Sequence, residues 1–248
     1  MNKINKDDRS GLDNEKKLVE YEFSEASGYI FVADGTTNLP MHCFAETEAR
    51  CIILPDTLKS MGKLCFGASR IERIAIPDSV TRIDYLCFAG TSNLESITLP
   101  KGIKEIPEFC FENSGIITVD IPEGVTKIDD GAFRNCTRLK RADLPMSLVE
   151  LGSGVFHNCP ISMIFIPPMI KTIVNMFYND IDCVPRRHTL FLPVYTEFIT
   201  NKPFLKFGPI EKYIDPNKYS LIRYDPELDD SLEDAISDYS IYRKHNMH

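Results

Sequence analysis

Apolar residues along this chain recur with a period of mostly 22 to 23 residues, and a proline follows each short apolar stretch. These prolines are Pro55, Pro77, Pro100, Pro122, Pro145, Pro167 and Pro193. A column of phenylalanines keeps the same phase, at Phe44, Phe66, Phe88, Phe111, Phe133, Phe156 and Phe177. Two columns in phase over many units indicate an internal repeat across residues 30–193.

Further apolar columns share this phase. The third residue after each proline is apolar, at Leu58, Val80, Ile103, Val125, Leu148 and Ile170. So is the sixth, at Met61, Ile83, Ile106, Ile128, Leu151 and Ile173. A degenerate first unit has Ile30, Val32, Leu39 and Phe44 in these columns, with Ala33 in place of the proline.

The pattern predicts the elements of one unit. The residues one and three before each proline are apolar, so they form one buried face of a short strand. Proline lacks an N–H and ends that strand. A second short extended piece follows, then a short helical turn that carries the phenylalanine. Small or turn-prone residues then bring the chain round, at Gly90, Asn113, Asn135, Asn158 and Asn179.

One such unit cannot bury its apolar face alone, so the units must stack, with parallel strands ~4.8 Å apart. The repeated form is apolar-x-apolar-Pro-x-x-apolar-x-x-apolar, ending in Cys or Ala before Phe, as in residues 74–88. This form resembles the BspA-like branch of the leucine-rich repeats, over about residues 28–213. The resemblance implies an α/β repeat fold, a leucine-rich-repeat solenoid with short parallel strands and irregular or short helical returns.

Three parts of the chain are expected. Residues 1–29 form an N-terminal segment, in which a strand from Leu18 to Phe23 caps the first unit. Residues 30–213 form the solenoid. Residues 214–248 form an acidic segment, in which Leu228, Leu232, Ile236 and Tyr239 have the spacing of an amphipathic helix. This candidate helix, Asp229 to Tyr242, is a docked cap, a partner-binding helix or part of a disordered tail.

The strand residues two and four before each proline point outward and form the candidate binding surface. Its centre is polar and its C-terminal end apolar, and the candidate partner-binding residues are Arg73, Thr98, Asp120, Arg141, Asp143, Met163, Phe165 and Phe191. Exposed Phe and Met side chains on a sheet favour a protein partner. The alternatives are distorted terminal units and cover by the C-terminal segment. Arg141 and Asp143 are placed next to Thr118 and Asp120 on the neighbouring strand, where a cross-strand ion network can form. Such charges form a solvated face that contributes little to stability, or they orient a partner.

The charge is concentrated at one end. The chain of 248 residues has 28 Lys and Arg, 36 Asp and Glu, and a formal net charge of −8. Residues 225–238 hold seven of the acids and no Lys or Arg, so the remaining residues sum to −8 + 7 = −1. The outward columns contain no basic stripe, and we therefore expect no nucleic-acid partner.

Motifs for chemistry are missing from the sequence. Four of the eight cysteines directly precede the column phenylalanine, where Ala132 and Val155 stand later, so they are expected to be reduced core thiols. The five histidines have no metal-ligand spacing, and no nucleophile elbow, P-loop or dinucleotide fingerprint is present. We expect no enzyme activity, no cofactor and no metal.

The function expected from these observations is non-enzymatic protein–protein interaction through the exposed strand face. The resemblance implies a cell-surface adhesin as one alternative. A second alternative is an inhibitor or immunity protein whose acidic tail binds a basic enzyme. The polar N-terminus lacks the apolar stretch of a secretory signal, and no stretch approaches a membrane span, so a cytoplasmic location is expected.

Overall fold

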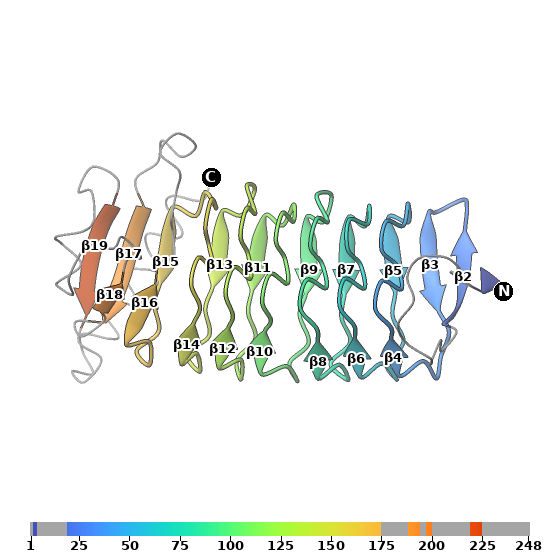
Figure 1. The fold of residues 1–248 in the computed structure, drawn as a ribbon, viewed down its shortest axis with the longest axis horizontal. Helices are drawn as coiled ribbons and strands as arrows, with labels where there is room; N and C mark the ends of the chain where they lie inside the picture. Colours follow the sequence, from blue (N-terminus) through green and yellow to red (C-terminus); the bar gives the residue numbers. More distant parts are fainter. Residues whose placement is uncertain (1, 4–18, 175–187, 194–196, 200–218, 225–248) are drawn as a thin grey trace.

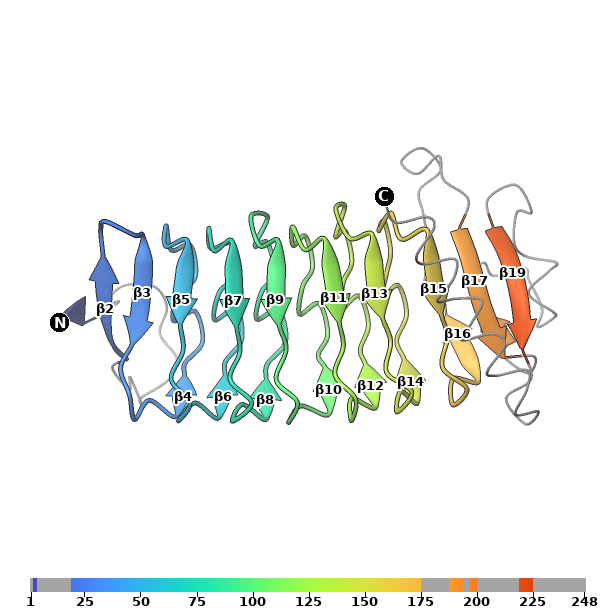
Figure 2. The same ribbon diagram turned by 180° about the vertical axis from the view of Figure 1, so that it is seen from behind.

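The computed structural model describes residues 2–3, 19–174, 188–193, 197–199 and 219–224, with side chains described for residues 19–173. Two rows of short strands run along an elongated slab (Figure 1). The view from behind shows the same two rows (Figure 2). Each repeat contributes one strand to each row, so the slab is a β-solenoid.

The first row begins with β3, which precedes Ala33, continues with the strands that precede the column prolines, and ends with β19. Its members are β3 (Tyr29–Val32), β5 (Cys51–Ile53), β7 (Arg73–Ala75), β9 (Ser96–Thr98), β11 (Thr118–Asp120), β13 (Arg141–Asp143), β15 (Met163–Phe165), β17 (His188–Pro193) and β19 (Tyr219–Tyr224). Neighbours pair in parallel, and the ladder is divided into three sheets, between β9 and β11 and between β13 and β15. The predicted parallel strands are confirmed.

The second row holds the short extended piece expected after each proline. Its strands are β4 (Asn38–Leu39), β6 (Ser60–Met61), β8 (Arg82–Ile83), β10 (Glu105–Ile106), β12 (Lys127–Ile128), β14 (Glu150–Leu151), β16 (Thr172–Val174) and β18 (Glu197–Ile199). They too pair in parallel within three sheets. The columns three and six residues after the prolines, from Leu58 to Ile173, are buried as predicted.

An antiparallel strand closes the N-terminal end of the slab. Strand β2 (Glu20–Ser24) pairs antiparallel with β3, and β1 (Asn2–Lys3) pairs antiparallel with β2. The strand predicted from Leu18 to Phe23 is therefore present, shifted toward Ser24. It covers the backbone edge that β3 would otherwise leave open to association with another chain.

The phenylalanine column forms the centre of the core. Six rings, from Phe44 to Phe156, are stacked with centroids 4.9 to 5.8 Å apart and with interplanar angles of 2° to 19°. Each of these rings is almost completely buried. Repetition at one position of every unit therefore gives a continuous aromatic stack along the solenoid axis.

The prediction of a short helical turn around each phenylalanine is wrong. In the described residues, these segments form hydrogen-bonded turns and contain no helix. In six successive units, the residues two before and two after the phenylalanine have positive φ; in the third unit these are Leu86 and Gly90. The N–H of Phe88 donates to Cys110 O of the next unit (2.8 Å), whereas Ala89 N–H donates to Leu86 O (3.0 Å). Donors thus alternate between the neighbouring unit and the local turn, because stacking supplies acceptors that a helix would not use.

The asparagine and glycine positions expected to turn the chain have this left-handed backbone, at Gly90, Asn113, Asn135 and Asn158. Phe177, Asn179 and the candidate helix from Asp229 to Tyr242 lie outside the described residues. The same holds for the boundary at residue 213.

Candidate functional site: the strand face

The outward side chains of the first row, from β3 to β15, form a surface that we call the strand face. At its N-terminal end, Phe31 of β3 and Ile53 of β5 are partners in the parallel register, and each is 44% exposed. Ala75 of β7 continues the same column and is exposed. The strand face therefore carries two adjacent large apolar side chains in contact with solvent.

A polar bridge borders this apolar patch. Tyr29, Cys51 and Arg73 occupy one register position on three successive strands. The Arg73 guanidinium donates a hydrogen bond of 2.8 Å to Tyr29 Oη, across the strand that carries Cys51. Cys51 is buried, although its column was expected to point to solvent, because the Arg73–Tyr29 bridge spans it. Burial raises the pKa of the Cys51 thiol, and the nearby positive charge of Arg73 offsets part of this increase.

The centre of the strand face is polar, as predicted. Arg73 and Thr98 are exposed, and so is Asp120. The cross-strand ion contacts that the spacing allows are present, because the Arg141 guanidinium contacts Asp120 of the neighbouring strand and lies 3.3 Å from Asp143 Oδ2. Arg141 thus lies between the carboxylates of two adjacent units.

The predicted apolar hot spot at the C-terminal end is not exposed in the way the alternation indicated. Phe165 is only 7% exposed, so its prediction as a solvent-facing residue is wrong. Met163 is half-buried. Phe191 is the register partner of Phe165 on β17, and its side chain lies outside the described part of the chain. Alternation fixes the direction of a strand side chain, whereas its burial also depends on what covers the sheet.

The sequence interpretation missed Tyr29 and Phe31 as surface residues. The signal was present, since they lie four and two residues before Ala33, which replaces the proline in the degenerate first unit. Extending the two outward columns by one unit identifies both residues.

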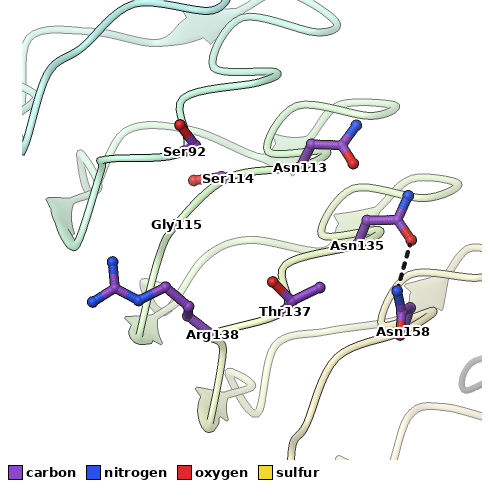
Figure 3. Close-up of a pocket in the computed structure, with 8 residues that line it drawn as sticks. All are labelled: Ser92, Asn113, Ser114, Gly115, Asn135, Thr137, Arg138 and Asn158. Atoms are coloured by element: carbon purple, nitrogen blue, oxygen red, sulfur yellow. Dashed lines mark hydrogen bonds between the residues drawn. The ribbon is translucent and has the colours of Figure 1, made fainter. Parts of the chain in front are cut away.

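A polar cleft of about 400 Å³ lies at another edge of the solenoid (Figure 3). Its lining residues are Ser92, Asn113, Ser114, Gly115, Asn135, Thr137, Arg138 and Asn158. Asn158 donates to the Asn135 side-chain oxygen over 3.3 Å, and Arg138 is paired with Glu95 at 2.7 Å. The three asparagines occupy the positive-φ position of successive units, and this backbone requirement accounts for them.

The described cysteines are buried free thiols, as predicted. Burial raises the pKa of Cys65, Cys87, Cys110 and Cys159, and these four thiols therefore remain protonated near neutral pH. The Cys136 thiol donates to the main-chain oxygen of Phe111 over 3.0 Å. The Cys159 thiol donates to the main-chain oxygen of Phe133, also over 3.0 Å. Within the described ranges, no three His, Cys, Asp or Glu residues are grouped closely enough to hold a metal ion.

The class of protein defined by this fold is a leucine-rich-repeat solenoid. A family model, "BspA type Leucine rich repeat region", matches residues 14–115 and 61–184 in overlapping segments with six copies of the repeat. The matched residues make up more than half of the chain, and the protein therefore belongs to the BspA-type leucine-rich-repeat family. Repeats of this kind are generally non-enzymatic scaffolds.

Two solved structures share this fold, and a third has weaker similarity to the chain. A leucine-rich repeat protein from Bacteroides ovatus is 22% identical with a TM-score of 0.54, over 77% of this chain and 44% of its own. The leucine-rich repeat protein of T. pallidum is 19% identical with a TM-score of 0.51, over 73% of this chain and 86% of its own. A leucine rich cell surface protein from Faecalibacterium prausnitzii is 20% identical with a TM-score of 0.45, over 78% of this chain and 59% of its own.

The chain thus spans less than half of the length of the B. ovatus protein that it matches. No curated protein matches the sequence. Among the residues that the structure describes, there is no helix with the length and apolar character needed to cross a bilayer.

Proposed function

We propose that this protein is a non-enzymatic binding module whose strand face takes up a protein partner. The observation that carries the proposal is the adjacent pair Phe31 and Ile53, each 44% exposed on a rigid parallel ladder. Contiguous exposed apolar side chains with a polar rim are a feature of protein interaction sites. Arg73, Thr98 and Asp120 extend the surface as a polar rim, which is the usual composition around a buried interface centre.

The strand face is suited to binding because its side chains are already fixed. The parallel ladder holds the backbone, and the Arg73–Tyr29 and Arg141–Asp120 contacts hold two of the long side chains in one arrangement. A partner therefore loses less free energy to side-chain ordering on this surface than on a flexible loop. We expect Phe31 and Ile53 to enter an apolar pocket of the partner, with the charged rim setting the orientation.

The test compares variants of the full chain in affinity purification from the native host, with quantitative mass spectrometry. The double variant Phe31→Ser/Ile53→Ser is expected to reduce recovery of the specific partner at least tenfold. The matched control is Met41→Ser/Met169→Ser, which removes two apolar side chains away from the strand face that are each 52% exposed. Equal recovery with the strand-face variant and the wild-type chain would show that the strand face is not the binding surface.

A rim variant separates orientation from affinity. Asp120→Ala/Arg141→Ala removes both partners of one ion pair and leaves the apolar patch intact. We expect a smaller loss of binding and a weaker dependence of the association rate on salt. An unchanged salt dependence would remove the charged rim from the proposal.

A second experiment determines the cellular compartment in which the protein binds its partner. A cytoplasmic partner and a cell-surface partner, as for an adhesin, require the same strand face but different compartments. Fractionation of the native host with an antibody against this chain distinguishes the two. A signal confined to the cytosol supports the cytoplasmic setting, and a signal on intact cells supports the adhesin.

A further inference from the structure

Strand β2 extends the strand face by one outward residue. Glu22 of β2 is the register partner of Phe31 on β3, and opposite residues of an antiparallel pair point to the same side of the sheet. Glu22 is exposed, as are Phe31 and Ile53. The neighbouring strands β2, β3, β5 and β7 (Figure 1) therefore present an acid, two large apolar side chains and then Ala75 beside Arg73.

The two charges at the ends of this row are not neutralised by the part of the chain that the structure describes. Glu22 and Arg73 lie three strand spacings apart, which is roughly 14 Å, and so do not reach each other. Neither forms an ion pair with another described residue, although the Arg73 guanidinium donates one hydrogen bond to Tyr29 Oη. A guanidinium has further N–H donors. By contrast, Asp120 and Arg141 pair with each other farther along the strand face.

The order acid, apolar, apolar, cation is complementary to its own reverse. A two-fold axis parallel to the strands, between β3 and β5, brings a second copy onto the first with its strand order reversed. Phe31 of each copy then faces Ile53 of the other. Glu22 faces Ala75, whose methyl side chain leaves room for the carboxylate. Arg73 lies two residues before Ala75 on the same side of β7, within side-chain reach of that carboxylate.

We propose that the strand face binds a second copy of this chain, face to face about this axis. The two-fold symmetry makes every contact twice, so the apolar pair is covered on both copies and two Glu22–Arg73 ion pairs form at its border. These ion pairs fix the orientation, because any other alignment leaves the charges opposite apolar side chains. The proposal rests on the proposed function, since the second copy is the protein partner of the strand face.

The size of this contact predicts its strength. The strands from β2 to β7 cover roughly 14 Å across the sheet, and the four residues of β3 extend over about 13 Å. A footprint of this size is smaller than that of an obligate dimer. We therefore expect a reversible dimer that forms at high protein concentration.

Sedimentation velocity of the full-length chain, under reducing conditions and up to about 1 mM, measures this association. We expect wild-type chains to form a dimer and no larger species, because a two-fold contact occupies the same surface on both copies. Phe31→Ser/Ile53→Ser is expected to raise the dissociation constant at least tenfold. A wild-type chain that remains monomeric throughout, or a dimer that the double variant leaves unchanged, would overturn the proposal.

Charge reversal tests the two-fold arrangement. Glu22→Arg places like charges opposite each other in a pair of variant chains, and so does Arg73→Glu. Each variant alone is therefore expected to dimerise at least tenfold more weakly than wild type. In an equimolar mixture of the two variants, both contacts join opposite charges, and we expect dimerisation within about threefold of wild type. Failure of the mixture to recover would contradict the two-fold pairing.

Glu105→Arg is the matched control for net charge. It makes the same charge change at an exposed position of β10, in the second row of strands, and is expected to leave the dissociation constant unchanged. Affinity purification with Phe31→Ser/Ile53→Ser separates this proposal from the proposed function. A monomeric wild-type chain, together with partner recovery that depends on Phe31 and Ile53, would reject the second copy and retain the strand face as the site for a different protein.

Discussion

The ring of Tyr21 stands edge-on to the ring of Phe44, with an interplanar angle of 87° and centroids 6.0 Å apart. The rings behind Phe44 are stacked nearly parallel, so Tyr21 is the point where the stack ends. It lies on β2, the strand that also covers the open edge of β3. One strand therefore closes both the backbone ladder and the aromatic core of the solenoid.

Removal of this ring is expected to destabilise the protein. Tyr21→Ala exposes Phe44 and lowers the free energy of unfolding by about 2 kcal/mol, since the ring is only partly buried. Phe23→Ala on the same strand is the control, because Phe23 is 41% exposed and its loss costs less than about 1 kcal/mol. Urea denaturation of the two variants measures the difference. Equal destabilisation would mean that the edge-on contact contributes nothing beyond the strand pairing.

The alternating turn geometry allows a substitution that increases stability. Ala68 is an exposed residue with a φ of 52°, which costs an alanine about 1 kcal/mol and a glycine almost nothing. Ala68→Gly is therefore expected to raise the free energy of unfolding by about 0.5 kcal/mol or more, after the entropy of the unfolded chain is counted.

The matched control for this variant is Ala75→Gly, in strand β7. Ala75 is also exposed but has extended backbone, and the substitution is expected to lower the free energy of unfolding by about 0.5–1 kcal/mol. Thermal and urea denaturation of both variants measure the two signs. A loss of stability in Ala68→Gly would contradict the assigned cost of the left-handed backbone.

Much of the fold could be predicted from the sequence because the same core positions recur in every repeat unit. The Pro55 and Phe66 columns fix the register of each unit against the next, and the residues in phase with them are buried as expected. The strand positions and the ion pair of Arg141 with Asp120 follow from the same register. Such contacts depend only on the spacing between adjacent units.

Two features of the structure could not be predicted from the sequence, for different physical reasons. The segment around Phe88 was assigned a helical turn because apolar spacing does not report φ, and Leu86 carries no side-chain signal for its positive φ. The alternation predicts an exposed Phe165, and this prediction is wrong because alternation gives the direction of a side chain but not its burial. By contrast, Phe31 was missed only because Ala33 interrupts the proline column.

The lack of a side chain at Gly115 is required by the close approach of two units. A Cβ atom at this position would lie 2.0 Å from the main-chain oxygen of Ser92, far inside contact distance. Gly115 N–H also donates to Thr91 O over 3.1 Å, which prevents the backbone from moving away without loss of that bond. Figure 3 shows Gly115 in this polar cleft, near Arg138.

Gly115→Ala is therefore expected to lower the free energy of unfolding by about 2–3 kcal/mol, because one of the two backbones must shift. Ser92→Ala is the control, since it removes an exposed hydroxyl from the same cleft and leaves the backbone contact intact. Its effect is expected to be within about 0.5 kcal/mol. Urea denaturation compares the two, and a neutral Gly115→Ala variant would show that the two units separate at no cost.

The buried thiols predict a loss of stability in alkali. Burial raises the pKa of Cys65, Cys87, Cys110 and Cys159 above the ordinary value of 9.0. Below pH 9 each thiol is protonated in both the folded and the unfolded state, and stability is unaffected. Above pH 9 the unfolded chain ionises first, so stability is lost as pH rises toward the pKa of each folded thiol. The contribution of each such thiol to this loss is at most about 1.4 kcal/mol per pH unit.

The Cys87→Ala variant isolates one of these thiols, and Ala132 shows that the same column accepts alanine. Urea denaturation between pH 8 and pH 10.5 is measured for both chains under reducing conditions. The loss of stability with pH above 9 is expected to be less steep in the variant, with about 1.4 kcal/mol per pH unit as the upper limit of the difference. Lysine and tyrosine ionisation is common to the two chains and cancels in the comparison. Identical slopes would mean that Cys87 ionises in the folded protein, which requires water or a cation to reach the centre of the solenoid.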